Sequence, residues 1–128
     1  MTARLLRAIE HPHVDILGHP SGRRILKRPP YPVDMEAVIA AAARHGVAIE
    51  INCQVERLDL NDVHAKLARD RGVPLVISSD AHSRHAFGRL RWGVMVARRA
   101  WLQPADVLNT RPFEAFRASL RRHRRQPA

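Results

Sequence analysis

Apolar residues recur along the chain in two spacings, which predict helices and strands in alternation. Short apolar runs predict buried strands within residues 14–20, at residues 47–52 and within residues 75–82. Helical spacing predicts helices before and between them, at residues 2–10, 35–45 and about 61–71. Asp34 is expected to cap the second of these helices and Gly46 to end it. Strands that alternate with helices in this way predict an α/β fold with a parallel sheet and right-handed crossovers.

The pattern becomes helical beyond residue 82. An apolar stripe is expected on one helix, formed by Phe87, Leu90, Val94 and Ala97. A last helix is expected to start at Pro112, with Asn109 or Thr110 as its cap. Its buried face is predicted to consist of Phe113, Phe116 and Leu120. The chain therefore combines parallel strands with a helical C-terminal part.

Composition limits the class of protein. The 128 residues are enough for one domain, and 45% apolar residues are enough for a real core. A single cysteine, Cys53, excludes an internal disulfide and suits a reducing cytoplasm. No apolar run approaches the about 20 residues that a membrane span needs, so no membrane partner is expected.

The charge is strongly positive, with 22 Lys and Arg against 12 Asp and Glu and a formal net charge of +10. Such an excess favours phosphate-rich partners through counterion release. Part of it lies in the arginine-rich tail, residues 120–128, and arginine-rich proteins also arise without any such partner. Charge alone therefore leaves nucleic-acid binding open.

Polar residues follow the predicted strands at their carboxyl ends, where α/β folds place their chemistry. Asp80 and His82 come directly after the third strand, His19 after the first and Asn52 ends the second. A carboxylate oxygen and neutral imidazole nitrogens suit a divalent metal such as Zn, Mn or Fe. The alternatives are a capping Asp80 with a surface His82, and a histidine that only completes a turn at position 19.

A basic, proline-rich loop follows the first strand, at residues 20–32. Its four basic residues are expected at the same edge of the sheet, where they would attract a substrate phosphate: Arg23, Arg24, Lys27 and Arg28. The alternative is a loop whose charges are merely solvated.

The sequence also resembles a known family. The motifs ILGHP (16–20), EIN (50–52), RLDL (57–60) and SSDAH (78–82) occur in the order and spacing of the C-terminal half of a PHP domain. The resemblance covers nearly the whole chain, and the PHP domain appended to bacterial family X DNA polymerases is the most similar.

This resemblance implies a distorted β/α barrel with divalent metals at the carboxyl ends of its strands. It implies phosphoester hydrolysis, in the polymerase-linked branch as a 3′–5′ exonuclease or related DNA end processing. Carried over by position, His19, Asp80 and His82 match metal ligands, and Asp80, His82 and Arg57 form the expected catalytic group. Asn52 matches a polar residue near that site. The expected substrate is DNA or another phosphate ester.

The family's first motif, a His-x-His followed by an Asp, and its middle Glu and His ligands have no counterpart in this sequence. A whole β/α barrel also takes about 250 residues. We therefore expect residues 1–128 to form one truncated, half-barrel PHP-type domain. Either the missing N-terminal half of the barrel or a polymerase module acts as its partner, or the chain is a non-catalytic, basic nucleic-acid-associated remnant.

Overall fold

The central layer of the molecule is a three-stranded parallel sheet in the order β1, β2, β3. The computed structural model describes residues 1–121, so residues 122–128 of the basic tail lie outside the description. The strands are β1 (Ile16–Leu17), β2 (Ala48–Asn52) and β3 (Leu75–Ser78). The α-helices are α1 (Thr2–Glu10), α2 (Met35–His45), α3 (Asp62–Asp70), α4 (Leu90–Arg99) and α5 (Phe113–Ser119). Three 3₁₀ turns are η1 (Arg84–Arg89), η2 (Pro104–Asp106) and η3 (Leu108–Thr110). The predicted α/β class, with parallel strands and a helical C-terminal part, is confirmed.

The ends of the central helices follow local signals in the sequence. The Asp34 side chain accepts a hydrogen bond from the Ala37 backbone N–H at 2.9 Å, which caps α2. Gly46 ends α2 in the left-handed region, with φ of 65°. Asn61 caps α3 by accepting from the His64 N–H at 2.8 Å. The predicted cap and stop of α2 are both confirmed.

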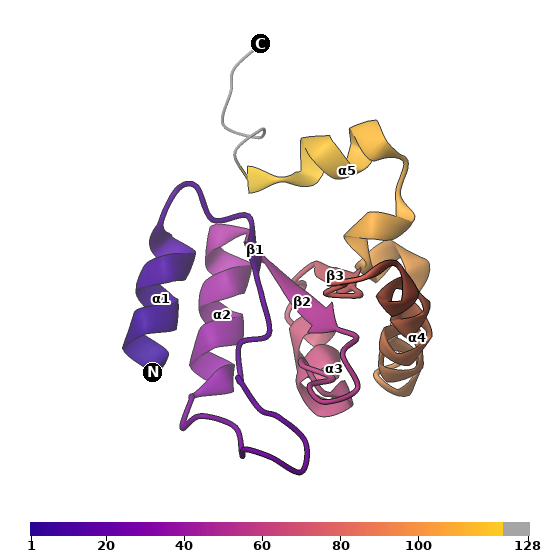
Figure 1. The fold of residues 1–128 in the computed structure, drawn as a ribbon. Helices are drawn as coiled ribbons and strands as arrows, with labels where there is room; N and C mark the ends of the chain where they lie inside the picture. The colour runs from indigo at the N-terminus through magenta and orange to yellow at the C-terminus, as the bar shows by residue number, and fades with distance from the viewer. Residues whose placement is uncertain (122–128) are drawn as a thin grey trace.

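Helices α1 to α4 pack against one face of the sheet, arranged around it from α1 beside α2 to α4 beside β3 (Figure 1). Alternate strand positions point into this layer, because successive side chains of a strand point to opposite faces. The core that results is formed by strand residues including Leu17, Ile49, Ile51 and Leu75, and by helix residues including Ile9, Val38, Ile39, Ala68 and Val96. This main core fixes the positions of the three strand ends.

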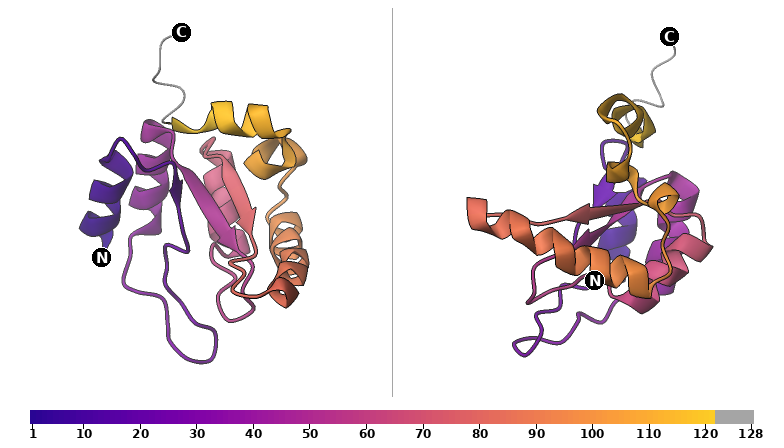
Figure 2. Two further views of the ribbon diagram at one scale, coloured as in Figure 1. Left: turned by 45° about the horizontal axis from the view of Figure 1, so that its top comes forward. Right: turned by 90° about the vertical axis from the view of Figure 1, so that its right-hand side faces the viewer.

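The second face of the sheet is covered at its amino end. There Ala48 and Val76 pack with Leu108, and Ile16 and Phe116 contact this smaller cluster. Helix α5 crosses the amino ends of the strands, on the side away from the loops that follow their carboxyl ends (Figure 2, left). By the same alternation, the carboxyl half of this face carries the polar residues of β2.

The outer edge of β3 is closed by a segment that precedes α5. Val107 forms a parallel bridge with Leu75. The Asn109 side-chain amide then donates to the Ile77 carbonyl at 2.8 Å and accepts from the Ile77 N–H at 3.1 Å. Asn109 therefore replaces a neighbouring strand, and its predicted role as a helix cap is wrong. Helix α5 begins after Pro112 without a side-chain cap.

Two predicted apolar faces are also wrong in part. Phe87, Leu90 and Val94 are exposed, at 61%, 40% and 45%, and α4 turns Gly93 and Ala97 toward the sheet. Figure 2 (right) shows the helical segment of η1 and α4 extending past the sheet.

In the last helix, Phe113 is exposed, whereas Phe116 and Leu120 are partly buried as predicted. None of the helices among residues 1–121 has the length and apolar character that crossing a bilayer requires.

Gly93 explains the orientation of α4. A Cβ added at this position would lie 2.2 Å from the Cys53 Sγ and 2.8 Å from the Ile77 Cγ2. Only a glycine therefore lets the helix backbone come this close to β2 and β3. Burial raises the pKa of the Cys53 thiol to about 11, so it remains protonated at neutral pH and packs as a small apolar group.

We expect Gly93→Ala to lower the free energy of unfolding by about 1–3 kcal/mol, because the added methyl group overpacks the contact with Cys53 and Ile77. Urea unfolding monitored by circular dichroism measures the change. Gly88→Ala is the matched control, since a Cβ there meets no atom within 4 Å. In a Cys53→Ala background, Gly93→Ala should lower the free energy of unfolding by less, because the methyl group then no longer meets the Cys53 sulfur. Equal costs in both backgrounds would contradict this account.

Candidate metal-binding site

Asn52, the last residue of β2, connects the polar side chains at the carboxyl ends of the three strands. Its side chain is fully buried. Its Nδ2 donates to the Asp80 Oδ2 at 3.0 Å and lies 3.4 Å from the Glu50 Oε2. Its Oδ1 accepts from the Gln54 backbone N–H at 3.0 Å. Because β2 is the middle strand, this one amide links the residues that follow β1 with those that follow β3.

The β1 side of the site is held by Glu50. The Glu50 Oε2 accepts a hydrogen bond from the His19 backbone N–H at 2.8 Å, at a turn where His19 has φ of 25°. The imidazole is thereby placed at the strand end, while the carboxylate fixes the backbone. Sequence analysis did not single out Glu50. Its position two residues before Asn52, on the same face of the strand, is the signal that could have identified it.

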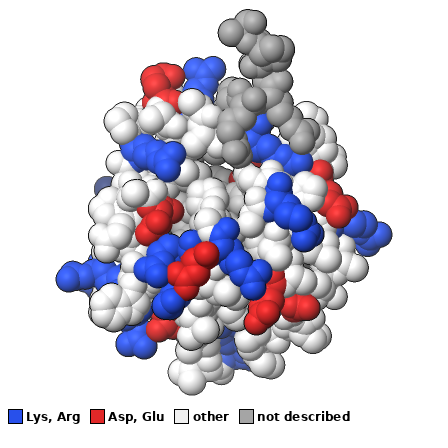
Figure 3. Space-filling view, turned by 180° about the vertical axis from the view of Figure 1, so that it is seen from behind, with Lys and Arg blue, Asp and Glu red and all other residues white. Residues whose placement is uncertain are grey.

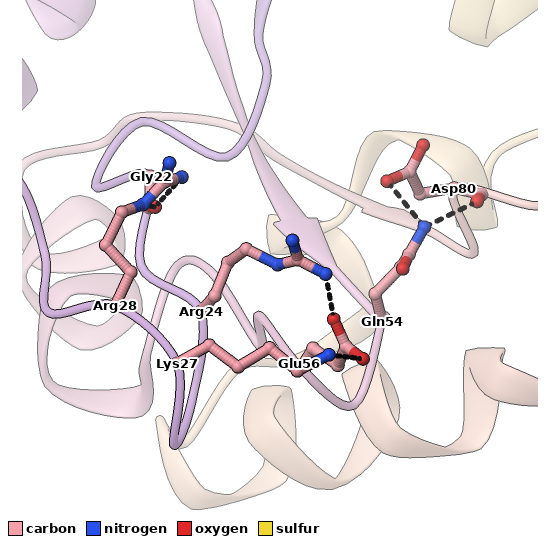
Figure 4. A network of polar contacts seen from close by, with 7 residues as sticks. All are labelled: Gly22, Arg24, Lys27, Arg28, Gln54, Glu56 and Asp80. Carbon is pink, nitrogen blue, oxygen red and sulfur yellow. Dashed lines mark hydrogen bonds and ion pairs between the residues drawn. The ribbon is translucent and has the colours of Figure 1, made fainter.

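The β3 side is held by Asp80 and Gln54. The Gln54 Nε2 donates to both the Asp80 Oδ2 and the Asp80 carbonyl, at 3.0 and 3.1 Å (Figure 4). The same carbonyl lies 2.8 Å from the His82 Nδ1. Because a carbonyl only accepts, this contact requires the proton on Nδ1 and leaves the His82 Nε2 as the lone-pair donor.

The electrostatics of the site favour an ionised Asp80. The hydrogen bond from Asn52 is the largest cause that lowers the pKa of the Asp80 carboxyl, against an opposing contribution from partial burial. The electrostatic influence of His82, His19 and Arg57 lowers this pKa further. The fold thus brings Arg57 close enough to act on the charge of Asp80, one of the three predicted ligands.

The predicted ligands do not by themselves close around an ion. Among residues 1–121, no three His, Cys, Asp or Glu side chains are close enough together to hold a metal. Asp80 and His82 are joined through a carbonyl, and His19 is tied to the same network through its backbone. A metal held by His19, Asp80 and His82 therefore stays a prediction.

The basic loop is neither a patch of free positive charges nor a loop whose charges are merely solvated. Arg24 and Lys27 form ion pairs with Glu56, the latter at 2.8 Å (Figure 4). The Arg23 Nε donates to the Arg57 carbonyl at 2.6 Å. The Arg28 guanidinium donates to a backbone carbonyl of the same loop. The loop is therefore clamped onto the segment that follows β2, and the expected patch of four free charges is wrong.

Two carboxylates make this clamp. Hydrogen bonds from Lys27 and then Arg24 lower the pKa of Glu56 to about 2. The buried Asp59 Oδ2 accepts from the Ser21 and Gly22 backbone N–H groups, at 3.0 Å each. Both residues belong to the polar segment that follows the second predicted strand, but their role as a clamp does not follow from the sequence, because their partners lie more than 25 positions away.

Positive charge elsewhere is interspersed with negative charge. On the face opposite to that of Figure 1, basic and acidic side chains lie next to one another (Figure 3). Lys66 and Arg69 pair with Asp70, and Arg99 pairs with Asp62. The net charge of +10 therefore does not form one continuous positive surface there.

Known proteins are similar to most of this chain. It is 38% identical over 120 residues to the DNA polymerase/3′-5′ exonuclease PolX of Bacillus subtilis. The aligned region covers 94% of the chain and 21% of that protein. It is 36% identical over 115 residues to a probable phosphatase of Thermoanaerobacter sp. (strain X514), covering 85% of the chain and 44% of that protein. A probable phosphatase of Shewanella sediminis is 35% identical over 117 residues, covering 87% of the chain and 45% of that protein.

The chain spans less than half the length of these relatives. No family model matches it. The chain is nevertheless a homologue of part of PolX and of part of the probable phosphatases, and the predicted resemblance to a PHP domain of the family X polymerases is confirmed.

We expect Asn52→Ala to destabilise the fold by about 1–3 kcal/mol, because it leaves buried partners without their hydrogen bonds. It should also raise the pKa of Asp80, whose ionised form the Asn52 amide stabilises. The lowered pKa of Asp80 contributes stability above the unfolded-state pKa, and this contribution is lost as pH falls through the folded-state value. Carboxyl titration by NMR measures the shift. The control is Asn61→Ala, which removes a helix cap and should leave the titration of Asp80 unchanged.

We expect Glu56→Gln to loosen the basic loop. Trypsin should cleave after Arg24 and Lys27 about two- to fivefold faster, the scale on which exposed ion pairs act. In the unsubstituted chain the ion pairs are fully present above pH 4.5 and are lost as pH falls toward 2, because Glu56 then becomes protonated. The Ile25 amide, which donates to the Glu56 carbonyl, reports this change by NMR. Glu114→Gln is the control, and equal cleavage rates in all three proteins would contradict the clamp.

Proposed function

We propose that this chain, a homologue of part of PolX and of the probable phosphatases, contributes to a metal-dependent phosphoesterase site. The finer form of the proposal is hydrolysis of a phosphodiester at a DNA end, as a 3′–5′ exonuclease associated with a family X polymerase. The observation that carries it is the hydrogen-bonded connection from Glu50 through Asn52 to Asp80. This connection ties together the strand ends that carry His19 and His82.

The donor atoms left over by this network are of the kind that a divalent metal binds. Asn52 and Gln54 both donate hydrogen bonds to the Asp80 Oδ2. The Asp80 Oδ1 makes no hydrogen bond among residues 1–121. The contact of the His82 Nδ1 with the Asp80 carbonyl fixes the tautomer that presents Nε2. One carboxylate oxygen and imidazole nitrogens from His82 and His19 form a donor set for Zn, Mn or Fe.

In the proposed reaction each residue has a distinct role. A divalent metal bound by these groups would supply Lewis acidity toward the scissile phosphate and an activated water. Asp80, ionised by its hydrogen bonds, and the two histidines would hold the ion. Arg57 would stabilise the negative charge of the phosphate, since its guanidinium already acts on the Asp80 carboxylate.

We further propose that the sheet is part of a PHP-type β/α barrel, completed by elements of a longer chain or by a partner chain. Four observations support this. The predicted ligands do not close around an ion within residues 1–121. The second face of the sheet is covered mainly at its amino end, by Leu108 and Phe116. The apolar side chains of Phe87, Leu90 and Val94 are exposed on η1 and α4. The relatives named above are more than twice as long as this chain.

A second candidate is a non-catalytic, basic nucleic-acid-associated domain that keeps the strand ends and the charge without the chemistry. The open donor set among residues 1–121 and the net charge of +10 favour it. It predicts DNA binding that survives chelation and weakens steeply with salt, as contacts to phosphate alone require.

Titration calorimetry with Mn²⁺ or Zn²⁺, together with hydrolysis of a generic phosphodiester, tests the first proposal against the second. We expect one weakly bound ion for the chain, lost in Asp80→Ala and in His82→Ala. Asp70→Ala is the matched control, because it removes a surface carboxylate that is paired with Lys66 and Arg69. Hydrolysis should follow metal binding in the same variants.

Equal metal affinity in the chain and in Asp80→Ala would contradict the proposed site. Absence of both metal binding and hydrolysis in a folded chain would favour the non-catalytic alternative. Circular dichroism of each variant separates loss of the site from loss of the fold.

A further inference from the structure

A positively charged cavity lies beside His19, on the β1 side of the sheet. Its volume is about 360 Å³, and it is enclosed by the first turn of α1, the turn after β1, the basic loop and the segment after β2. Its lining includes Arg4, Arg28, Arg57 and His19, and no aspartate or glutamate among residues 1–121 contributes to it. The cavity therefore collects arginines from three separated parts of the sequence, which are the start of α1, the basic loop and the segment after β2.

The arginines of this cavity differ from the other basic residues of the loop. Arg24 and Lys27 form ion pairs with Glu56. The Arg23 guanidinium donates hydrogen bonds to the backbone carbonyls of Arg57 and Leu58. The side chains of Arg4 and Arg57, in contrast, make no hydrogen bond or ion pair among residues 1–121. Their donors remain available to a ligand.

Arg28 is held in place without being neutralised. Its Nη2 and Nε donate to the Gly22 carbonyl at 2.7 and 3.2 Å (Figure 4). Its guanidinium also lies 4.8 Å from the centre of the Tyr31 ring. Tyr31 itself packs against Gly22, where a Cβ would lie 2.2 Å from the ring. A guanidinium fixed by a carbonyl and a ring keeps its full charge and its remaining donors.

Arg57 links this cavity to the candidate metal site. Its backbone is fixed, because its N–H donates to the Gln54 carbonyl at 2.7 Å and its own carbonyl accepts from Arg23. Its side chain lines the cavity and also acts electrostatically on Asp80. Asp80 and His82 follow β3, whereas the cavity adjoins His19 after β1, so the cavity lies at the His19 end of the candidate metal site.

We propose that this cavity binds a phosphate of the substrate other than the one that is hydrolysed. Guanidinium groups present paired donors that match phosphate oxygens. Arg4 and Arg28 line the cavity beside Arg57, which is proposed to face the hydrolysed phosphate, and no aspartate or glutamate among residues 1–121 contributes to the lining. The inference rests on the proposed function and narrows its substrate. A site for a second phosphate beside the hydrolysed one fits a nucleic-acid strand, and it offers nothing to a small phosphomonoester.

The test is binding of a fluorescently labelled oligothymidylate to the full chain, measured by anisotropy in the presence of a chelator. Arg4→Gln should weaken binding about tenfold, the scale of one charged hydrogen bond. It should also reduce the slope of log affinity against log salt by about 0.7, as loss of one phosphate contact on a single strand predicts.

Arg7→Gln is the matched control, because it removes the same charge from the same helix outside the cavity. It should leave affinity within about twofold of the unsubstituted chain, since surface charges at a distance are screened. Equal losses in Arg4→Gln and Arg7→Gln would overturn the proposal in favour of diffuse attraction.

Competition identifies the source of the phosphate. Thymidine monophosphate and inorganic phosphate should displace the oligonucleotide only at concentrations far above that of an unlabelled oligonucleotide. Displacement by the monophosphate at comparable concentration would overturn the assignment to a strand. The chelator separates this test from the test of hydrolysis, because oligonucleotide binding is measured without metal. If binding depends on Arg4 but the chain shows no hydrolysis when metal is supplied, the proposed function is contradicted and the cavity assignment stands.

Discussion

The buried amide of Asn52 is the interaction on which the polar edge of this molecule depends. It sits at the end of the middle strand, fully removed from solvent, and it satisfies a carboxylate on each side. A buried amide with such partners is rigid, because each unmade hydrogen bond would leave a desolvated group. The turns that carry His19 and Asp80 both have positive φ, and both are held through this network. Local strain at the candidate site is thus compensated by long-range hydrogen bonds.

The same principle governs the charge of the molecule. A net charge of +10 suggested a broad surface for phosphate, yet most basic residues of the loop after β1 serve to clamp it onto the segment after β2. Glu56 and Asp59 carry out this clamping, one at the surface and one in the interior. Net charge is a sum over the chain, so it does not say which cations are already neutralised. Next to the candidate site, Arg4, Arg28 and Arg57 line one cavity.

The fold also explains why the candidate site is open. The helices α1 to α4 cover one face of the sheet and form the main core. The other face is packed by apolar residues at its amino end and carries Glu50 and Asn52 at its carboxyl end. This division puts the apolar packing and the candidate site at opposite ends of the same strands, as in other folds built from parallel strands.

The sequence by itself determined the elements of this protein. Helix α2 begins at Asp34 and ends at Gly46 because capping and left-handed backbone preferences act within a few residues. The three strands and the position of Asp80, His82 and His19 at their ends follow equally from local apolar runs.

Only the tertiary structure decided which side chains meet. Asn109 completes the edge of β3 from 32 positions away, and Gly93 turns α4 so that Leu90 and Val94 of the expected apolar stripe face outward. Glu50 reaches His19 across 31 positions, and Asp59 reaches Ser21 across 38. Such contacts depend on how packed layers bring distant segments together, whereas local sequence patterns report only the preferences of neighbouring residues.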